Sequence, residues 1–496
     1  MYFIGVDLGT SSVKILVMDA QGQIVNTTSK DYPLYFPKPL WSEQNPQDWL
    51  EQSLVGMKEA LSDLDARKVS AIGFSGQMHG LVLLDAHDTV IRPAILWNDQ
   101  RSIVETNYLN EEIGIDALTS YTGNIAFPGF TAPKLLWVKQ NEPENFARIK
   151  KIMLPKDYLA YKMTGSFATD YADASGTLYL DVENKKWSQP MMDILGITED
   201  QLPKLFESYE TIGTLNKDVA QYLELPVDAA SGASSVKVII GSGDQACAAV
   251  GGGVVAPGRC SISLGTSGVV FVHSDTFIKD PGNGLHAFCH ANGAYHLMGC
   301  MLSAAGSLKW WVEDILKSRQ YNTLMDEATD ASIDNGLYFL PYLMGERSPH
   351  NDPNARGVFW GLNLTHGQGD MTRAVIEGVA FALRDSFEIV KALGQGIEEI
   401  RINGGGSKND FWCQLIADVL DTKVVKLETD AGPAYGASIL ATIGAGAYKT
   451  VSEACDSLIK TTETYVPNQT QTLLYSNKYK SFSKLYPALK DLFTQV

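Results

Sequence analysis

The sequence predicts an α/β protein built from two duplicated domains. Its 496 residues exceed what one hydrophobic core usually organises, so two large domains are expected. The stretch "DLGTSSVKILVMD" near the N-terminus has a later counterpart, "SLGTSGVVFVHSD", and both carry LGTS between apolar runs. Each half therefore begins with a strand, a turn of glycine and hydroxyl residues, and a returning strand.

In the first half, residues 1–32 predict a β-meander with a turn at Gln21-Gly22. Helical spacing begins after Asn45, which is a suitable N-cap. The apolar stretches between residues 69 and 97 predict further strands, and residues 131–163 have a mostly helical pattern. We expect residues 169–179, "TDYADASGTLY", to form a loop because glycine, aspartate and serine interrupt them.

In the second half, residues 236–253 predict a strand, a turn and a helix. A second meander follows over 260–275 and 284–300, and three helical patterns come after it. We place the domain boundary near residues 241–253. This choice divides the chain into an N-terminal domain, a C-terminal domain and a helical tail, over residues 1–246, 254–444 and 445–496.

Composition limits the partners of the protein. The net charge of −17 argues against nucleic acid or an anionic membrane surface as the main partner. The chain enters a strand pattern at once, without the basic and apolar regions of a signal peptide, and no apolar run approaches a membrane span. We therefore expect a cytoplasmic protein whose partner is a small molecule. A homodimer is compatible with the sequence, which does not determine the oligomeric state.

Neither cysteine nor histidine spacing predicts a metal site. The six cysteines are scattered without a C-x-x-C motif, which is typical of reduced thiols. His286 and His290 are four residues apart, a spacing that has meaning only on a helix. The alternation around them and the turn at 291–293 predict a hairpin instead.

Each copy of LGTS is a candidate phosphate-binding loop. Glycine lets a backbone approach closely, and amides freed at turns form anion-binding nests. One copy alone is equally well a polar turn, but two copies would grip one polyphosphate from both sides. Mg²⁺ accompanying the phosphates needs only one or two carboxylates, so Asp7 suffices, and Ser263 stands at the equivalent place. The candidate ligands are Gly9, Thr10, Ser11, Ser12 and Lys14, with Gly265, Thr266 and Ser267 in the second copy.

Beyond these loops, eight segments in order along the chain resemble the FGGY carbohydrate kinases, and within that family the kinases of D-xylulose. They are "PLWSEQNPQDW", "SGQMHGLVLLD", "ILWNDQRS", "GNIAFPGFTAPKLLW", "LPKDYLAYKMTG", "GDQACAAVG", "FLPYLMGERSPHNDPNARG" and "NGGGSKNDFW". The resemblance implies the fold of actin and Hsp70, with two duplicated ribonuclease H-like domains that flank a cleft for ATP and sugar. It implies that residues 1–246 form the sugar-binding side and residues 254–444 the nucleotide-binding side. It also implies ATP- and Mg²⁺-dependent phosphorylation of D-xylulose at its terminal hydroxyl.

Asp244 stands where an apolar strand ends and a helix begins. From this position alone a structural N-cap is the favoured interpretation, since a carboxylate there caps free N–H groups. The resemblance implies instead that Asp244 is the catalytic base that takes the proton of the sugar hydroxyl. Its neighbour Gln245 would hydrogen-bond sugar hydroxyls as donor and acceptor.

Met78 and His79 follow an apolar strand and resemble the sugar-contacting dipeptide of the D-xylulose kinases. A small neutral polyol needs donors and acceptors on an apolar floor, although a lone histidine is more often structural. Asn98, Asp99 and Arg101 in "WNDQRS" are further sugar-binding candidates. Asp99 could equally pair with Arg101 and make no substrate contact.

The stretch "EEIRINGGGSKNDFW" predicts a strand, a triple glycine and the start of a helix. In the family such a loop holds the adenosine part of ATP, which carries over to Gly405, Gly406 and Asn409; a plain glycine turn is the alternative. Residues 432–448 predict a helix of small residues packed closely under that loop.

Two other functions stay open at this stage. One is a kinase for another polyol, such as ribulose, gluconate or glycerol. The other is a non-catalytic, nucleotide-dependent sugar-binding module, against which the presence of both Asp7 and Asp244 argues.

Overall fold

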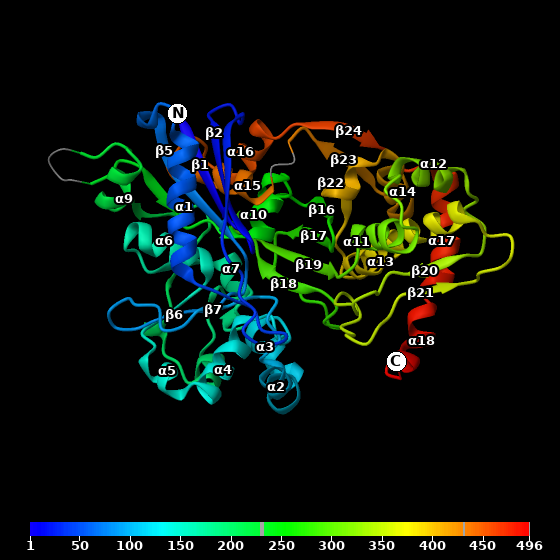
Figure 1. Ribbon diagram of the computed structural model, residues 1–496, viewed down its shortest axis with the longest axis horizontal. Helices are drawn as coiled ribbons and strands as arrows, with labels where there is room; N and C mark the ends of the chain where they lie inside the picture. Colours follow the sequence, from blue (N-terminus) through cyan, green and yellow to red (C-terminus); the bar gives the residue numbers. More distant parts are fainter. Residues whose placement is uncertain (229–232, 430–431, 496) are drawn as a thin grey trace. The chain divides into compact units, whose positions relative to one another are not determined.

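The computed structural model describes residues 1–228, 233–429 and 432–495 (Figure 1). The chain divides into two compact units, and neither unit is one continuous stretch of sequence. Unit 1 contains Met1–Val255, Ala287–Tyr295 and Ala431–Ile459. Unit 2 contains Ala256–His286, His296–Asp430 and Lys460–Val496. The chain therefore leaves each unit and returns to it.

The main sheet of unit 1 has the strand order β13-β14-β5-β1-β2-β3, and β15 also pairs with β5. The first three strands, β1 to β3, form the predicted antiparallel meander. Strand β5 runs parallel to β1, and β14 and β15 each run parallel to β5. The strands are β1 (Tyr2–Leu8), β2 (Ser12–Asp19), β3 (Ile24–Asp31), β5 (Val69–Gly76), β13 (Thr211–Thr214), β14 (Lys237–Ile239) and β15 (Ser242–Gly243).

The sheet of unit 2 repeats this arrangement. The order β19-β17-β16-β22-β23 corresponds to β3-β2-β1-β5-β14, and β16 pairs antiparallel with β17 and parallel with β22 as β1 does with β2 and β5. The predicted α/β fold with two duplicated domains is confirmed. The strands are β16 (Gly258–Leu264), β17 (Gly268–Ser274), β19 (Tyr295–Met301), β22 (Ile397–Asn403), β23 (Lys423–Leu427) and β24 (Thr461–Tyr465). Strand β18 (His286–Cys289) falls, apart from His286, within the residues of unit 1.

Short strand pairs complete the β-structure among the described residues. They are β4 (Glu43–Gln44) with β7 (Ala94–Ile95), β6 (Val82–Leu84) with β8 (Lys151–Met153), β9 (Ala168–Asp170) with β12 (Lys204–Phe206), β10 (Leu180–Asp181) with β11 (Lys186–Trp187), and β20 (Tyr338–Leu340) with β21 (Val358–Trp360). The predicted hairpin around residues 291–293 is confirmed, with His290 just past β18 and His296 within β19.

The predicted helices form where their patterns place them. Asn45 caps α1 as expected, because its side chain accepts a hydrogen bond from the amide of Gln47. In unit 1 the helices are α1 (Pro46–Leu61), α2 (Ile103–Asn107), a π-helix (Tyr108–Gly114), α3 (Ile115–Thr122), α4 (Thr131–Asn141), α5 (Pro143–Arg148), α6 (Pro155–Thr164), α7 (Tyr171–Ser175), α8 (Gln189–Leu195), α9 (Lys217–Tyr222), α10 (Asp244–Gly251), α15 (Gly432–Ala445) and α16 (Val451–Leu458).

The helices of unit 2 include one of 25 residues, α13, within the helical pattern predicted there. They are α11 (Ala305–Lys309), a π-helix (Trp310–Ile315), α12 (Tyr321–Asp330), α13 (Gln368–Ala392), α14 (Asp410–Leu420), α17 (Gln469–Phe482) and α18 (Leu485–Phe493). Among the helices of the described ranges, none combines the length and the apolar character that crossing a membrane requires.

The expectation of a loop over residues 169–179 was wrong. Its first residues end β9, and Tyr171–Ser175 form the short helix α7. The carboxylate of Asp170 caps this helix by accepting from the amides of Ala172 and Asp173, at 3.2 and 3.3 Å. Asp170, which the sequence pattern placed in a loop, is therefore the N-cap of α7.

The packing predicted for residues 432–448 was also wrong. The helix α15 belongs to unit 1, where it packs on β1, β5 and α10 instead of under the triple glycine. Its backbone approaches these elements so closely that a Cβ atom on Gly5 or Gly73 would overlap carbonyl oxygens of α15. The glycines of β1 and β5 are therefore required for α15 to pack this closely on the sheet.

We predict that Gly436→Ala destabilises unit 1. A Cβ atom at Gly436 would overlap the backbone carbonyl oxygen of Cys247 in α10, and backbone cannot move aside as a side chain can. Overpacking of this kind costs about 1–3 kcal/mol, which urea unfolding would measure. Gly396→Ala is the control, because no heavy atom lies within 4 Å of its added Cβ. Equal unfolding midpoints for both variants would contradict the close packing of α15.

Candidate functional site

Three parallel strands of unit 1 end at one edge of the sheet. The register pairs Asp7 of β1 with Ser75 of β5, and Ser75 with Ser242 of β15. From this edge β1 continues into the first LGTS loop, β5 into the Met78-His79 segment and β15 into Asp244. Ligands of open α/β sheets bind outside the carboxyl ends of the strands. The fold of unit 1 thus brings together its predicted phosphate loop, sugar dipeptide and base.

Asp244 is the first residue of α10, and Gly243 occupies the N-cap position. Burial and, after it, the nearby charge of Asp7 raise the pKa of Asp244 to about 7, although hydrogen bonds from Gln245 lower it. Gln245 therefore hydrogen-bonds the Asp244 carboxylate, a role that sequence reasoning did not assign to it. A carboxylate with a pKa near neutrality is suited to exchange a proton at physiological pH.

Asp7 lies on β1 opposite Lys14 of β2 and accepts a hydrogen bond from Ser75 Oγ at 2.9 Å. Burial raises the pKa of Asp7 to about 6, while the hydrogen bond from Ser75 and the charge of Lys14 lower it. Within the described ranges no group of three or more histidine, cysteine or acidic side chains could hold a metal ion. A Mg²⁺ ion that arrives with phosphate oxygens needs only one or two carboxylates, so Asp7 fits such an ion.

The carbonyl groups of the first LGTS loop are all engaged by unit 1. Gly9 O accepts from the Tyr32 hydroxyl, Thr10 O from Gln44 Nε2 at 2.6 Å, and Ser11 O from the Tyr32 amide at 3.2 Å. These bonds keep the negative ends of the loop's peptide dipoles on protein donors, as an anion-binding loop requires. Sequence reasoning missed Tyr32 and Gln44, because nothing in their local pattern places them beside the loop.

The Met78-His79 pair is held rigidly. Met78 is buried against Gly243, where an added Cβ would stand 2.7 Å from Met78 Cγ. His79 Nδ1 lies 2.7 Å from Gly176 O, and its ring stacks on Phe130 with centroids 4.6 Å apart. A carbonyl oxygen only accepts, so Nδ1 carries the proton and Nε2 of the neutral ring is an acceptor. That polarity suits a neutral hydroxyl donor.

Asp99 is an ion-pair residue. It is fully buried, and its two oxygens accept from Arg101 at 2.7–3.0 Å and from the Ser42 amide at 2.6 Å. This is the pairing with Arg101 that the sequence left open. Asn98 differs, since its Oδ1 is buried with no hydrogen-bond partner among the described residues. Asn98 Oδ1 can therefore accept a hydrogen bond from a ligand.

Helix α7 contributes residues that the sequence did not flag. Gly176, just after α7, lies so close to the His79 ring that a Cβ there would overlap it. Asp173 Oδ1 would stand 3.1 Å from a Cβ on Gly243, the residue before Asp244. Burial raises the pKa of Asp173 well above its ordinary value; the charge of Lys156 opposes this effect, and the charges of neighbouring aspartates, Asp244 among them, add to it. The spacing of two aspartates in "TDYADASG" was the only available signal.

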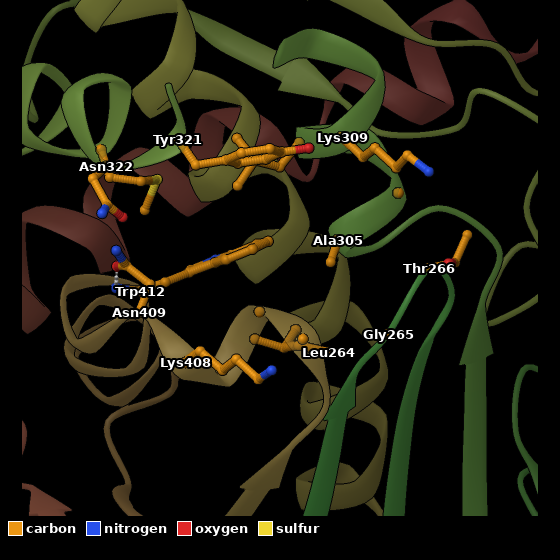
Figure 2. Close-up of a pocket in the computed structure, with 15 residues that line it drawn as sticks. Leu264, Gly265, Thr266, Ala305, Lys309, Tyr321, Asn322, Lys408, Asn409 and Trp412 are labelled. Atoms are coloured by element: carbon orange, nitrogen blue, oxygen red, sulfur yellow. Dashed lines mark hydrogen bonds between the residues drawn. The ribbon is translucent and has the colours of Figure 1, made fainter. Parts of the chain in front are cut away.

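In unit 2 a cavity of about 510 Å³ collects five of the predicted nucleotide residues (Figure 2). They are Gly265, Thr266, Gly405, Gly406 and Asn409, whereas Ser267 does not line it. Tyr321 and Trp412 lie on opposite sides of the cavity in Figure 2, and sequence reasoning identified neither. Asn409 caps α14 by accepting from the Trp412 amide at 2.9 Å. A flat space between aromatic walls beside a glycine loop suits a nucleobase.

Comparisons with known proteins identify the family of the chain. The model of the FGGY family of carbohydrate kinases, N-terminal domain, matches residues 2–251, and that of the C-terminal domain matches residues 260–445. The chain belongs to the FGGY family of carbohydrate kinases. The predicted membership is confirmed, so the protein is an enzyme that transfers phosphate from ATP to a sugar.

Two relatives of this FGGY kinase match it along almost its whole length. The xylulose kinase of Escherichia coli (strain K12) is 41% identical over 493 residues, which are 99% of each chain. A xyloylose kinase from Brucella ovis has a solved structure with a TM-score of 0.93 and 38% identity, covering 99% of this chain and 100% of that one.

The structure of a gluconate kinase from Lactobacillus acidophilus is also similar. It has a TM-score of 0.94 and 28% identity, and the match covers 100% of this FGGY kinase and 99% of that chain. The backbone is thus alike in kinases named for a neutral ketose and for an acid sugar. Fold similarity by itself does not choose between those substrates.

We predict that kcat/KM of this FGGY kinase falls as the pH is lowered through about 7, because Asp244 must be ionised to accept a proton. In Asp7→Asn the midpoint of the residual activity should move to lower pH, since the charge of Asp7 raises the pKa of Asp244. Initial rates between pH 5 and about 9 would measure both profiles. An acid limb centred near 4, the ordinary range of an aspartate, would contradict the assignment.

Proposed function

We propose that this kinase converts D-xylulose and ATP into D-xylulose 5-phosphate and ADP, with Asp244 as the base. The observation that carries the proposal is the 41% identity to the Escherichia coli xylulose kinase over 99% of both chains. The arrangement of Asp244, Met78 and His79 at one sheet edge of unit 1 supports it. A neutral polyol fits this edge, because the predicted contacts offer hydrogen bonds and an apolar floor without a cation.

In the proposed reaction Asp244 orients the terminal hydroxyl of the sugar and accepts its proton late in the transfer. The bond between the hydroxyl oxygen and the γ-phosphorus forms, and the bond from that phosphorus to the bridging oxygen of ADP breaks. Gln245, which hydrogen-bonds the Asp244 carboxylate, keeps the base oriented. His79 Nε2 accepts a hydrogen bond from a second sugar hydroxyl.

The nucleotide would use groups from both LGTS loops. Asp7 would hold Mg²⁺, which neutralises charge on the β- and γ-phosphates, and Lys14 lies across from it on β2. Thr10, Ser11 and Ser12 in the first loop and Gly265 and Thr266 in the second are the proposed phosphate contacts. The adenosine part would occupy the cavity lined by Gly405, Gly406 and Asn409.

A kinase of gluconate is the second candidate, because the structure from Lactobacillus acidophilus that carries this name has a TM-score of 0.94. Gluconate is an anion at neutral pH, and an acid sugar is normally recognised through a cationic partner. The proposed sugar contacts Met78, His79 and Asn98 provide no fixed positive charge. This difference favours the neutral ketose.

We predict that D-xylulose gives the largest kcat/KM in a coupled assay of ADP release, ahead of ribulose, gluconate and glycerol. ADP release without sugar should be slow. A higher kcat/KM with gluconate would favour the second candidate. Nucleotide binding without sugar-dependent ADP release would instead favour a non-catalytic binding module.

We predict that Asp244→Asn folds and binds sugar but transfers phosphate about 10²–10⁴-fold more slowly, the usual effect of losing a general base. Asparagine keeps the size and the helix-terminal hydrogen bonding of the aspartate, so capping alone would change little. Calorimetric sugar binding, melting temperature and turnover separate the two roles. Asp116→Asn, a first-turn acid of α3, is the control for loss of a helix-terminal charge. Near-native turnover in Asp244→Asn would rule out the base.

A further inference from the structure

The backbone of His79 is held in a conformation that its residue type disfavours. Its φ of 68° lies in the left-handed region, which non-glycine residues occupy at a cost in free energy. Such a conformation persists only where the surroundings fix it, and it is frequent at ligand-binding positions. The groups that fix His79 therefore decide whether its ring faces a ligand correctly.

Two side chains of α4 hold the carbonyl group of His79. Thr131 Oγ1 donates to His79 O at 3.1 Å, and Lys134 Nζ donates to the same oxygen at 3.0 Å. Thr131 and Lys134 are three residues apart and so lie on one face of the helix. Phe130, the residue before the helix, stacks on the His79 ring. One helix start thus holds both the backbone and the ring.

Lys134 is an unusual choice for this task. Its side chain is fully buried, and within the described residues no carboxylate lies within salt-bridge distance of Nζ. Its second hydrogen bond, at 2.7 Å, goes to the carbonyl of Gly129. Burial lowers the pKa of Lys134 well below its ordinary value, which Asp99 partly offsets. Burying a lysine without an ion pair costs free energy of folding, which points to a functional role for its two hydrogen bonds.

The Gly129 carbonyl connects Lys134 to the second sugar-binding segment. A Cβ atom on Gly129 would stand 2.5 Å from Trp97 O, so this glycine lies directly against the residue before Asn98. Lys134 therefore bridges the backbone of His79 and the backbone that supports Asn98. Both residues are proposed sugar contacts.

We propose that Lys134, assisted by Thr131, is a positioning residue that fixes the strained His79 backbone and thereby sets the affinity for the sugar. The proposal deepens the proposed function and rests on His79 being a sugar contact. Lys134 does not touch the substrate or the reacting atoms. It acts on the sugar through the carbonyls of His79 and Gly129.

The test compares Lys134→Met, Thr131→Val and a matched control in the full-length protein. Lys134→Met removes both hydrogen bonds and should raise the KM for D-xylulose about five- to tenfold. Thr131→Val removes one hydrogen bond and should raise it about two- to fivefold, whereas Thr131→Ser should restore the native value. The KM for ATP should stay unchanged in all three variants. Equal changes in both KM values would overturn the proposal.

Lys139→Met is the control on the same helix. Lys139 Nζ donates to Leu195 O at 3.0 Å, so this variant loses the same type of hydrogen bond without touching His79. Its KM for D-xylulose should equal the native value. If Lys139→Met raised the sugar KM as much as Lys134→Met, general loosening of α4 would be the cause, and the proposal would fail.

A double-mutant cycle with His79→Ala shows whether Lys134 acts through His79. In the His79→Ala background, Lys134→Met should raise the sugar KM clearly less than it does in the native protein, because only its effect through Gly129 remains. Fully additive effects would overturn the positioning role while leaving the proposed function intact. An unchanged sugar KM in His79→Ala itself would overturn both. Should Lys134→Met fail to fold, the Thr131→Val and Thr131→Ser pair, crossed with His79→Ala, decides by the same criteria.

Discussion

The structure behind the sheet edge of unit 1 that carries the candidate site is held together by one buried lysine. Lys156 Nζ lies 2.6 Å from Asp157, 2.8 Å from Asp170 and 3.6 Å from Asp173, and all four side chains are withdrawn from solvent. Burial alone would lower the pKa of Lys156, but the three carboxylates outweigh it and raise that pKa. Removing one member of a buried ion pair typically costs about 3–5 kcal/mol, since a charge is left uncompensated. The cluster therefore fixes α6 and α7 relative to each other.

The same cluster reaches the proposed base through hydrogen bonds. Asp170 Oδ2 accepts from Ser208 Oγ at 2.7 Å and from Ser242 Oγ at 2.8 Å. Ser242 begins β15, the two-residue strand that ends directly before Asp244. A strand so short has little pairing of its own, so the hydrogen bond to Asp170 supplies support that the sheet does not. The ionic cluster, the strand and the proposed base thus form one continuous polar structure behind the proposed sugar site.

Much of the candidate site was predictable, because its residues stand at the ends of strands that the sequence marks clearly. Asp7, Met78, His79 and Asp244 all follow apolar runs and lie at the same sheet edge. The supporting residues were not predictable. Tyr32 and Gln44 reach the first LGTS loop from elements that carry no motif of their own, and only the folded chain brings them there.

The sequence by itself determined the duplicated α/β architecture, the family and the residue types of the candidate site, because these depend on local patterns and short motifs. Tertiary structure decided three other matters. The helix α15 joins unit 1, because Gly5 and Gly73 carry no side chain and so let its backbone approach the sheet closely. Asp99 belongs to Arg101, because both are buried together. The strained backbone of His79 exists only because α4 packs beside it, and no local pattern encodes a contact between residues that lie so far apart in the chain.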